Sequence, residues 1–451
     1  MDDQVGSVVE RTLQYVSASE FRKLLALDAP APEKVALFAD LCRINVLYMI
    51  ARAGSGHIGS SFSSLDMVSW LLLHELRDGL GEDGAEDLFF SSKGHDVPAY
   101  YAALIGLGRL DFDLLHRLRR LDGLPGHPDI ATPGVPTNTG SLGMGISKAK
   151  GMIFANRLSE RPGRVFVMTG DGELQEGQIW ESLVSAINHR LHELTVIVDH
   201  NKLQSDTFVG RTSELGDLEA KFAAFGWHVE RCDGHDLEAF AACLLGAKAA
   251  EDRPAVIIAD TVKGRGVSFM EHNRIGSPSE LYEFHSGAPD APSYVSGVLE
   301  IIDRVNEHLR RLGQGKLTPV VMERPSTQAP AAAATPQRLV AAYGDALVAQ
   351  GREKPELVVL DADLALDCGV LPFKEAFPER FVECGIAEQD MVSQAGGMAL
   401  RGLRPVVHSF ACFLSTRPNE HIYNNATEGK RVVYVGSLAG LVPGGPGHSH
   451  Q

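Results

Sequence analysis

The feature that most limits the possible folds is a repeated alternation of short branched apolar runs with stretches of helical periodicity. Such runs stand at residues 165–168, 194–198 and 255–258, and a helical pattern at 32–53 ends at Gly54-Ser55-Gly56. Parallel strands covered by helices on both faces typically appear as continuous apolar runs joined by helical segments. The alternation therefore predicts an α/β fold with parallel sheets flanked by helices.

A segment rich in Pro and Ala divides the chain into two such units. It covers residues 313–336 and has the composition of a linker. After it, a helical pattern at 339–347 is followed by further apolar runs at 357–360, 380–383, 405–407 and 431–435. We therefore expect one α/β domain at 1–312 and a second at 337–451. Because the last residues have loop composition, the second domain is expected to be incomplete, so that the chain is a fragment or a separate polypeptide supplies the remainder.

Composition excludes several classes of protein. With 44% hydrophobic residues in 451, the chain can bury a large core, and it is not disordered. The 42 Lys and Arg against 58 Asp and Glu give a net charge of -16, which argues against nucleic acid or an anionic membrane as partner.

The start has no leader pattern and no apolar run is long enough to span a membrane, so we expect a soluble, cytoplasmic protein. The 6 cysteines have no spacing of a zinc site or disulfide framework, and we expect them to be reduced.

Polar residues follow two successive predicted strands. Gly170-Asp171-Gly172 follows one strand and Asn201 follows the next. Open α/β sheets bind ligands at the carboxyl ends of their strands. A carboxylate and an amide oxygen form an incomplete ligand set that a small hard cation such as Mg²⁺ would complete with water and diphosphate oxygens. The glycines allow close approach of the diphosphate, and a helix beginning near Glu173 would direct N–H groups at it. Since Gly-Asp-Gly alone is more often a turn, the pairing with Asn201 carries the prediction.

These residues resemble the thiamine diphosphate-binding motif, and their neighbours resemble the transketolase family in particular. Four further segments stand in the order that this family shows, at 55–57, 92–95, 124–128 and 139–143. The resemblance covers nearly the whole chain. It implies a diphosphate-binding domain before the linker, a pyrimidine-binding domain after it, and thiamine diphosphate with Mg²⁺, Ca²⁺ or Mn²⁺ as cofactors. Each histidine taken singly is more often structural, and Gly140 to Gly145 could also be a simple helix-start turn.

The resemblance assigns roles to individual residues. Histidines that would surround the substrate and exchange protons with it are His57, His95, His127, His285 and His450. Residues that would contact the cofactor are Gly140, Leu142, Gly172, Glu176 and Asp363. Metal ligands would be Asp171, Asn201 and the main-chain carbonyl of Leu203. By contrast, the residues 233–236, Asp-Gly-His-Asp, are predicted to be a turn and a helix cap.

The second unit contains a segment, 384–389, that resembles the glutamate motif of the family. Its Glu388 would hold a carboxyl group against the aminopyrimidine ring and favour the imino form that generates the ylid. Phe410 and Phe413 resemble the aromatic segment around that ring, where Thr416 replaces a third aromatic residue; without the resemblance they would be ordinary core residues. In this family the glutamate domain of one subunit faces the diphosphate domain of another, which implies a homodimer.

Several positions depart from family members that use sugar phosphates. If Ser449-His450-Gln451 corresponds to their Thr-His-Gln, Pro446 stands where they carry an aspartate. Asp367 falls at a serine that contacts the distal phosphate, and Leu438 falls at a histidine. Arg338 retains a phosphate-binding arginine. We therefore expect an acceptor other than an ordinary pentose phosphate, in specialised metabolism.

The resulting hypothesis is transfer of a two-carbon ketol unit from a ketose to an aldehyde through a thiamine diphosphate ylid. One alternative is a dehydrogenase first component, which passes a glycolyl or acyl unit to a lipoyl or carrier protein. Another is a non-catalytic subunit of a split enzyme. Retention of Asp171 and Asn201 together with Glu388 argues against the last, because a scaffold needs neither half of a cofactor site.

Overall fold

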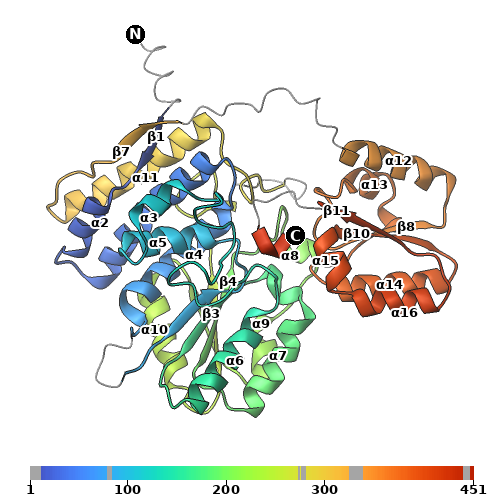
Figure 1. Cartoon of the computed structure of the whole chain (residues 1–451), viewed down its shortest axis with the longest axis horizontal. Helices are drawn as coiled ribbons and strands as arrows, with labels where there is room; N and C mark the ends of the chain where they lie inside the picture. The colour runs from blue at the N-terminus through green and yellow to red at the C-terminus, as the bar shows by residue number, and fades with distance from the viewer. Residues whose placement is uncertain are drawn as a thin grey trace, which may run out of the picture. The chain divides into compact units, whose positions relative to one another are not determined.

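The structure is a computed structural model of the chain and describes residues 12–78, 84–272, 275, 281–324, 339–439 and 447–450. It divides into two compact units. The first consists of Met1–Asp206 and Gly216–Pro325, and the second of Thr207–Leu215 and Ser326–Gln451. Figure 1 shows a helix-covered sheet in each.

The first unit is built on a five-stranded parallel sheet with the strand order β2-β3-β4-β6-β5. Its strands are β2 (Leu88–Ser91), β3 (Val165–Gly170), β4 (Leu194–His200), β5 (His228–Asp233) and β6 (Ala255–Asp260). The apolar runs of the three central strands are buried, which explains why they lack a polar face. The predicted strands and the α/β class are confirmed.

Helices surround this sheet. They are α2 (Ala18–Leu25), α3 (Ala31–Ala53), α4 (Ile58–Trp70), η1 (Leu71–Glu75), α5 (Val97–Gly106), η2 (Phe112–His116), α6 (Gly145–Leu158), η3 (Gly172–Gln175), α7 (Gly177–Asn188), α9 (Leu218–Ala224), α10 (Leu237–Ala249) and α11 (Ala291–Arg311). The helix predicted at 32–53 is confirmed as α3, which ends at Gly54 with a left-handed φ of 80°. It packs against α4, α5 and α11 and lies in the middle of the helical layer (Figure 1).

A strand lies inside the segment predicted to be a linker. β7 (Val320–Glu323) pairs antiparallel with β1 (Thr12–Tyr15), so this part of 313–336 belongs to the first unit. Composition did not reveal β7 because its apolar run, Val320 to Met322, is short and lies next to a segment rich in Pro and Ala. The remainder of the predicted linker, from 325 onward, lies outside the described residues.

The second unit has a four-stranded parallel sheet with the strand order β11-β10-β8-β9. Its elements are α8 (Val209–Thr212), α12 (Leu339–Glu353), β8 (Leu357–Asp361), α13 (Leu371–Ala376), η5 (Pro378–Arg380), β9 (Phe381–Glu383), α14 (Glu388–Leu400), β10 (Arg404–Phe410), α15 (Ala411–Thr416), α16 (Asn419–Thr427), β11 (Val433–Ser437) and η6 (Gly447–His450). α12 and α13 cover one face of the sheet, and α14 and α16 cover the other (Figure 1). Alternate residues of β8 enter the two cores, Val359 on one side and Leu360 on the other.

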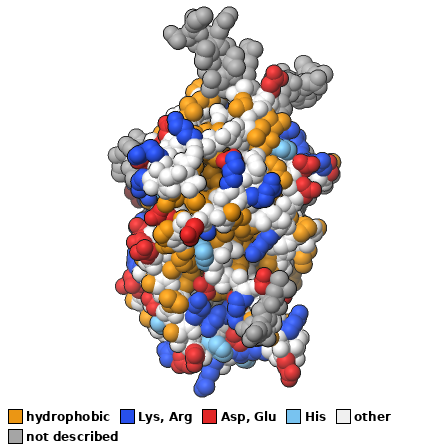
Figure 2. Space-filling model, turned by 90° about the vertical axis from the view of Figure 1, so that its left-hand side faces the viewer, with side chains coloured by type: hydrophobic (Ala, Val, Ile, Leu, Met, Phe, Trp, Pro, Cys, Tyr) orange, Lys and Arg blue, Asp and Glu red, His pale blue; other side chains and the backbone are white. Residues whose placement is uncertain are grey.

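The face in Figure 2 carries charges of both signs, and the cysteines are not joined in disulfides. On the face in Figure 2, basic and acidic side chains stand side by side. None of the helices in the described part of the chain is both long enough and apolar enough to cross a bilayer. All cysteines are free thiols, as predicted, and four of them are buried.

Candidate functional site

The adjacent ends of β3 and β4 carry the predicted oxygen donors. Asp171 follows β3 and Asn201 follows β4, and both side chains are buried. Oδ2 of Asp171 accepts a hydrogen bond of 2.5 Å from the backbone N–H of Lys202, which joins the two strand ends. Oδ1 of Asn201 accepts one of 3.1 Å from the N–H of Leu203. The structure thus brings Asp171, Asn201 and Leu203 into one small region.

This donor set fits a small hard cation. Burial raises the pKa of Asp171 to about 6, and no lysine or arginine of the described residues forms a salt bridge with it. A buried carboxylate without a cationic partner is costly, and a divalent ion would supply the missing charge. Among the described residues no group of three or more His, Cys, Asp or Glu could hold a metal. The set at Asp171 is of another kind, because an amide and a main-chain oxygen accompany one carboxylate.

Glu173 lies at the predicted helix start, and its side chain has a further role. The helix expected to begin near it is the short 3-10 helix η3, which starts at Gly172, and the α-helix α7 follows from Gly177. The buried carboxylate of Glu173 accepts hydrogen bonds from Ser92 Oγ (2.5 Å), Gly143 N (2.8 Å) and Gly170 N (3.2 Å). It therefore holds three loops together, and burial raises its pKa. Sequence reasoning missed this role, for which an acidic residue among glycines was the only signal.

The predicted cofactor loops approach one another closely. A Cβ on Gly94 would lie 2.6 Å from the backbone nitrogen of Gly140, so this contact requires glycine. Gly143 has a φ of 89°, and its added Cβ would lie 2.9 Å from Cβ of Glu176. Leu142, which stands between Gly140 and Gly143 in the sequence, is half-buried. A Cβ on Gly172 would likewise meet Cγ of Gln204 at 2.8 Å. Side-chain-free backbone of this kind suits a ligand that must come close.

Four predicted histidines form a cluster. The ring of His57 lies 5.3 Å from His95, 6.1 Å from His127 and 5.3 Å from His285, measured between centroids. Burial lowers the pKa of His57, His95 and His285, and neighbouring cations lower it further, so these rings are neutral near pH 7. Nδ1 of His57 is buried without a hydrogen-bond partner among the described residues. Neutral imidazoles can both donate and accept hydrogen bonds, as a polyhydroxylated ligand requires.

A buried lysine joins this cluster to the oxygen donors. Nζ of Lys263 lies 3.1 Å from Nδ1 of His285 and 3.5 Å from the carbonyl oxygen of Leu203. It also donates to the carbonyl oxygen of Gln204. The histidines and the candidate metal ligands are therefore parts of one site in the first unit.

A buried ion pair lies next to Asn201 and helps to position it. Lys93 Nζ lies 2.5 Å from Oδ2 of Asp199, which also accepts a hydrogen bond from Ser63 Oγ at 2.7 Å. Thr261 donates to the other oxygen of Asp199. Nδ2 of Asn201 faces Asp199 at 3.4 Å, which turns the amide oxygen of Asn201 away from that carboxylate. Sequence reasoning missed Asp199, although a charged residue inside an apolar strand was a usable signal.

The second unit brings together its own predicted residues. Glu388 begins α14 and is only 2% exposed. Nη1 of Arg417 lies 2.8 Å and 2.9 Å from its two carboxylate oxygens, and the guanidinium lies 4.5 Å from the ring centroid of Phe413. The ring of Phe413 is 5.7 Å from Phe410 and 5.1 Å from His450. Arg417, which sequence reasoning missed, therefore links the glutamate to the aromatic group.

The remaining predicted positions are more scattered. Asp363 follows β8 with a φ of 61°, and its N–H donates to Oε1 of Glu383 at 3.0 Å. Asp367 and Leu438 are exposed, and Thr416 donates to the carbonyl oxygen of Cys412 at 2.6 Å. Arg338, Pro446 and Gln451 lie outside the described residues.

The segment 233–236 forms a turn and a helix cap, as predicted. Asp233 Oδ1 accepts from the N–H of His235 at 2.8 Å, and Asp236 Oδ1 accepts from Glu238 and Ala239 at the start of α10. Local structure therefore explains the two aspartates, whereas the ring of His235 makes a long-range contact, with Nδ1 2.8 Å from Oδ2 of Asp66.

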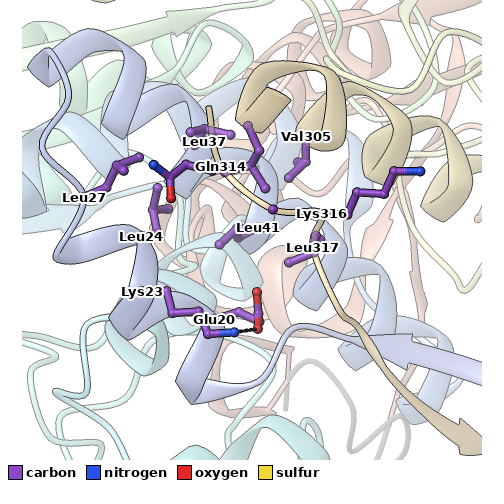
Figure 3. A pocket seen from close by; sticks show the side chains of 12 residues that line it. Glu20, Lys23, Leu24, Leu27, Leu37, Leu41, Val305, Gln314, Lys316 and Leu317 are labelled. Carbon is purple, nitrogen blue, oxygen red and sulfur yellow. Dashed lines mark hydrogen bonds and ion pairs between the residues drawn. The ribbon is translucent and has the colours of Figure 1, made fainter. Parts of the chain in front are cut away.

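A separate cavity of about 210 Å³ opens between α2, α3 and α11. Figure 3 shows leucines on its walls and an ion pair of Glu20 with Lys23 at its edge. It contains none of the residues described above. Because its walls are mostly apolar, and Glu20 and Lys23 pair with each other, the cavity is a weaker candidate site than the histidine cluster.

Two family models match the chain. Residues 35–283 match "Transketolase, thiamine diphosphate binding domain" and residues 336–451 match "Transketolase, pyrimidine binding domain". Transketolase-like protein 2 of Mus musculus is 32% identical over 432 residues, which are 92% of this chain and 66% of that protein. The 6-deoxy-6-sulfo-D-fructose transketolase subunit SqwG of Clostridium sp. (strain MSTE9) is 38% identical over 237 residues, 52% of this chain and 86% of that protein.

Solved structures agree on the fold. Transketolase from Leishmania mexicana superposes with a TM-score of 0.52 at 23% identity, over 94% of this chain and 71% of that chain. The chain spans about two thirds of the length of the curated full-length relatives it matches. Because the first family model alone covers more than half of the residues, the predicted resemblance is confirmed, and the chain belongs to the transketolase family.

Proposed function

We propose that the protein transfers a two-carbon ketol unit from a ketose donor to an aldehyde acceptor, with thiamine diphosphate and a divalent cation, Mg²⁺ by preference. The main support is the joining of the histidine cluster to the oxygen donors by Lys263, which lies near both His285 and the Leu203 carbonyl. A site that binds only a cofactor would have no use for four converging histidines.

In this proposal the first unit holds the diphosphate and the metal. Asp171, Asn201 and the carbonyl of Leu203 bind the cation. The cofactor contacts come from the closely approaching loops, through Gly140, Leu142, Gly172 and Glu176, and from Asp363 of the second unit. The raised pKa of Asp171 fits a carboxylate that is completed by a cation.

When bound, thiamine diphosphate supplies a nucleophilic carbon and a sink for the electron pair of the broken carbon–carbon bond. Glu388 keeps a proton at the pyrimidine ring nitrogen, and Phe410 with Phe413 covers that ring. The four histidines of the first unit, with His450 of the second, donate hydrogen bonds to the substrate oxygens. One of them takes the hydroxyl proton of the donor as its carbon–carbon bond breaks, and returns a proton when the acceptor is joined.

We further propose that the active form is a homodimer, because the family resemblance sets the glutamate domain of one subunit against the diphosphate domain of another. A second polypeptide remains an alternative partner. It is supported by the name of one relative, SqwG, which is a transketolase subunit and matches 52% of this chain.

The test is a calorimetric titration of thiamine diphosphate into the chain with and without Mg²⁺, followed by assays with a ketose and an aldehyde. We expect thiamine diphosphate binding to depend on Mg²⁺ and turnover to depend on the aldehyde. In Asp171→Asn, the binding of thiamine diphosphate should no longer depend on Mg²⁺. Turnover only with a lipoyl or carrier domain would favour the dehydrogenase alternative. Binding without turnover in any mixture would favour a non-catalytic subunit, and absence of binding would contradict the cofactor assignment.

A further inference from the structure

An arginine that has no acidic partner among the described residues lies beside the histidine cluster. Nη1 of Arg119 donates a hydrogen bond of 3.0 Å to Oγ of Ser55, two residues before His57. The side chain of Arg119 is half-buried, and no carboxylate among the described residues forms an ion pair with it. Withdrawing a charge even partly from water is costly when no opposite charge compensates it. This cation therefore needs an explanation.

The turn that carries Arg119 is closely determined. Arg119 adopts a left-handed φ of 57°, and its N–H donates to the carbonyl oxygen of Leu124 at 2.7 Å. The N–H of Leu124 donates in return to the carbonyl of Arg117 at 3.0 Å. A Cβ on Gly123 would lie only 2.0 Å from that carbonyl oxygen, so glycine is required there. A strained residue held in place from both sides is typical of a functional position.

The two neighbouring arginines behave differently. Arg117 forms a salt bridge of 3.2 Å with Asp122, and both side chains are well exposed. Arg120 is exposed as well. Of these three cations, only Arg119 combines partial burial, the bond to Ser55 and the lack of an acidic partner among the described residues.

Among the described residues, the groups found around Arg119 are hydrogen-bond donors and cations. Its guanidinium is close enough to contribute to the lowered pKa of His57. Beyond His57 lie His285 and the ammonium group of Lys263, 3.1 Å from the His285 ring. The buried Nδ1 of His57 has no partner in the described structure. A ligand that complements this set must bring anionic oxygen atoms.

We propose that Arg119 binds an anionic oxygen group, a carboxylate or a phosphate, on the small-molecule substrate of the histidine site. The arginine thereby makes the protein select charged substrates over neutral ones. This inference rests on the proposed function only in taking the histidine cluster as the substrate site. The planar guanidinium can accommodate both carboxylate and phosphate, so the test has to separate them.

The test compares three aldehydes in the cofactor-loaded full chain: glycolaldehyde phosphate, glyoxylate and neutral glycolaldehyde. For the wild type we expect a lower KM with at least one of the anionic probes than with glycolaldehyde, and the better probe identifies the anionic group. Arg119→Met should raise the KM of that probe about tenfold or more, with little change for glycolaldehyde. The matched control Arg120→Met, on the same turn, should leave all three KM values unchanged.

Two more variants separate recognition from a structural role. Ser55→Ala removes the hydrogen-bond partner but keeps the charge, so the preference for the anion should persist. Arg119→Lys keeps the positive charge and should retain part of that preference. It therefore still tests the inference if Arg119→Met does not fold. Equal weakening of charged and neutral probes by Arg119→Met, or a wild type without preference, would overturn the inference.

A binding measurement distinguishes this inference from the proposed function. Inorganic phosphate and glyoxylate are titrated separately into the wild type and Arg119→Met, with thermal stability as the readout. Stabilisation by either anion that depends on Arg119, without any ketol transfer, would support the inference while contradicting the proposed function. Ketol transfer without anion preference, together with stabilisation that is independent of Arg119, would support the proposed function and overturn the inference.

Discussion

Arg417 forms an ion pair with Glu388 through a single nitrogen: Nη1 lies 2.8 Å from Oε1 and 2.9 Å from Oε2 of the carboxylate. Both partners are largely withdrawn from solvent, with side-chain exposures of 14% and 2%. The charge of the arginine offsets the cost of burying the glutamate at the start of α14. The residue proposed to act on the cofactor is therefore held in place by the fold of its own unit.

Arg417→Met should destabilise the second unit by about 3 kcal/mol, because it leaves a buried carboxylate without its partner. Urea unfolding followed by hydrogen exchange of α14 and β10 peptides would measure this locally. Arg404→Met is the control, since Arg404 forms an exposed pair with Glu356 and should contribute less than about 1 kcal/mol. Similar effects of the two substitutions would show that burial of the Arg417 pair has no special weight.

Glu388→Gln should abolish ketol transfer while leaving the affinity for thiamine diphosphate largely intact. Glutamine has nearly the same shape and can still accept from Arg417, but its neutral amide lacks the negative charge that would keep a proton on the pyrimidine ring nitrogen. Turnover and calorimetric binding measured on the same preparation would separate the two effects. Normal turnover would remove Glu388 from the mechanism.

The fold was predictable because its signals are local. The apolar runs at 165–168 and 194–198 became β3 and β4, and the period of 32–53 became α3. Strand β7 escaped because its pairing with β1 depends on a partner at the opposite end of the first unit.

The site was predictable only where a motif carried it. Four of the five predicted histidines come together, whereas the supporting pair of Lys93 and Asp199 joins residues 106 positions apart, which no local pattern reveals. Glu173 is a second case. An acidic residue at this position suggests the first turn of a helix, which is where it lies, but the sequence does not reveal that its carboxylate also joins loops. Such roles depend on which chain segments meet, and that is decided by tertiary packing.

Lys93→Met should lower the free energy of unfolding of the first unit by about 3–5 kcal/mol, because Asp199 would be left buried without its cation. The loss should also weaken Mg²⁺-dependent cofactor binding, since Asp199 orients the amide of Asn201. Chemical denaturation and calorimetry would test the two effects. Lys23→Met, which breaks the exposed pair with Glu20, serves as the control and should have an effect below about 1 kcal/mol. An equally mild Lys93→Met would contradict the importance of the buried pair.

His408 should make the stability of the second unit depend on pH. The ring is fully buried, with Nδ1 3.1 Å from the carbonyl oxygen of Leu360 and Nε2 2.6 Å from the hydroxyl of Tyr343. Since a carbonyl only accepts, Nδ1 carries the proton and the Tyr343 hydroxyl donates to Nε2. Burial lowers the pKa of His408 from 6.5 to about 4. As the pH falls below 6.5 the unfolded chain binds the proton first, so stability present above 6.5 is lost progressively down to about 4, by about 3 kcal/mol in total.

Urea unfolding at pH 7.5, 5.5 and 4.5, with hydrogen exchange of β10 peptides, would measure this loss. His408→Gln should flatten the pH dependence while the exposed His189→Gln should not, and an unchanged slope in His408→Gln would assign the acid sensitivity to other groups.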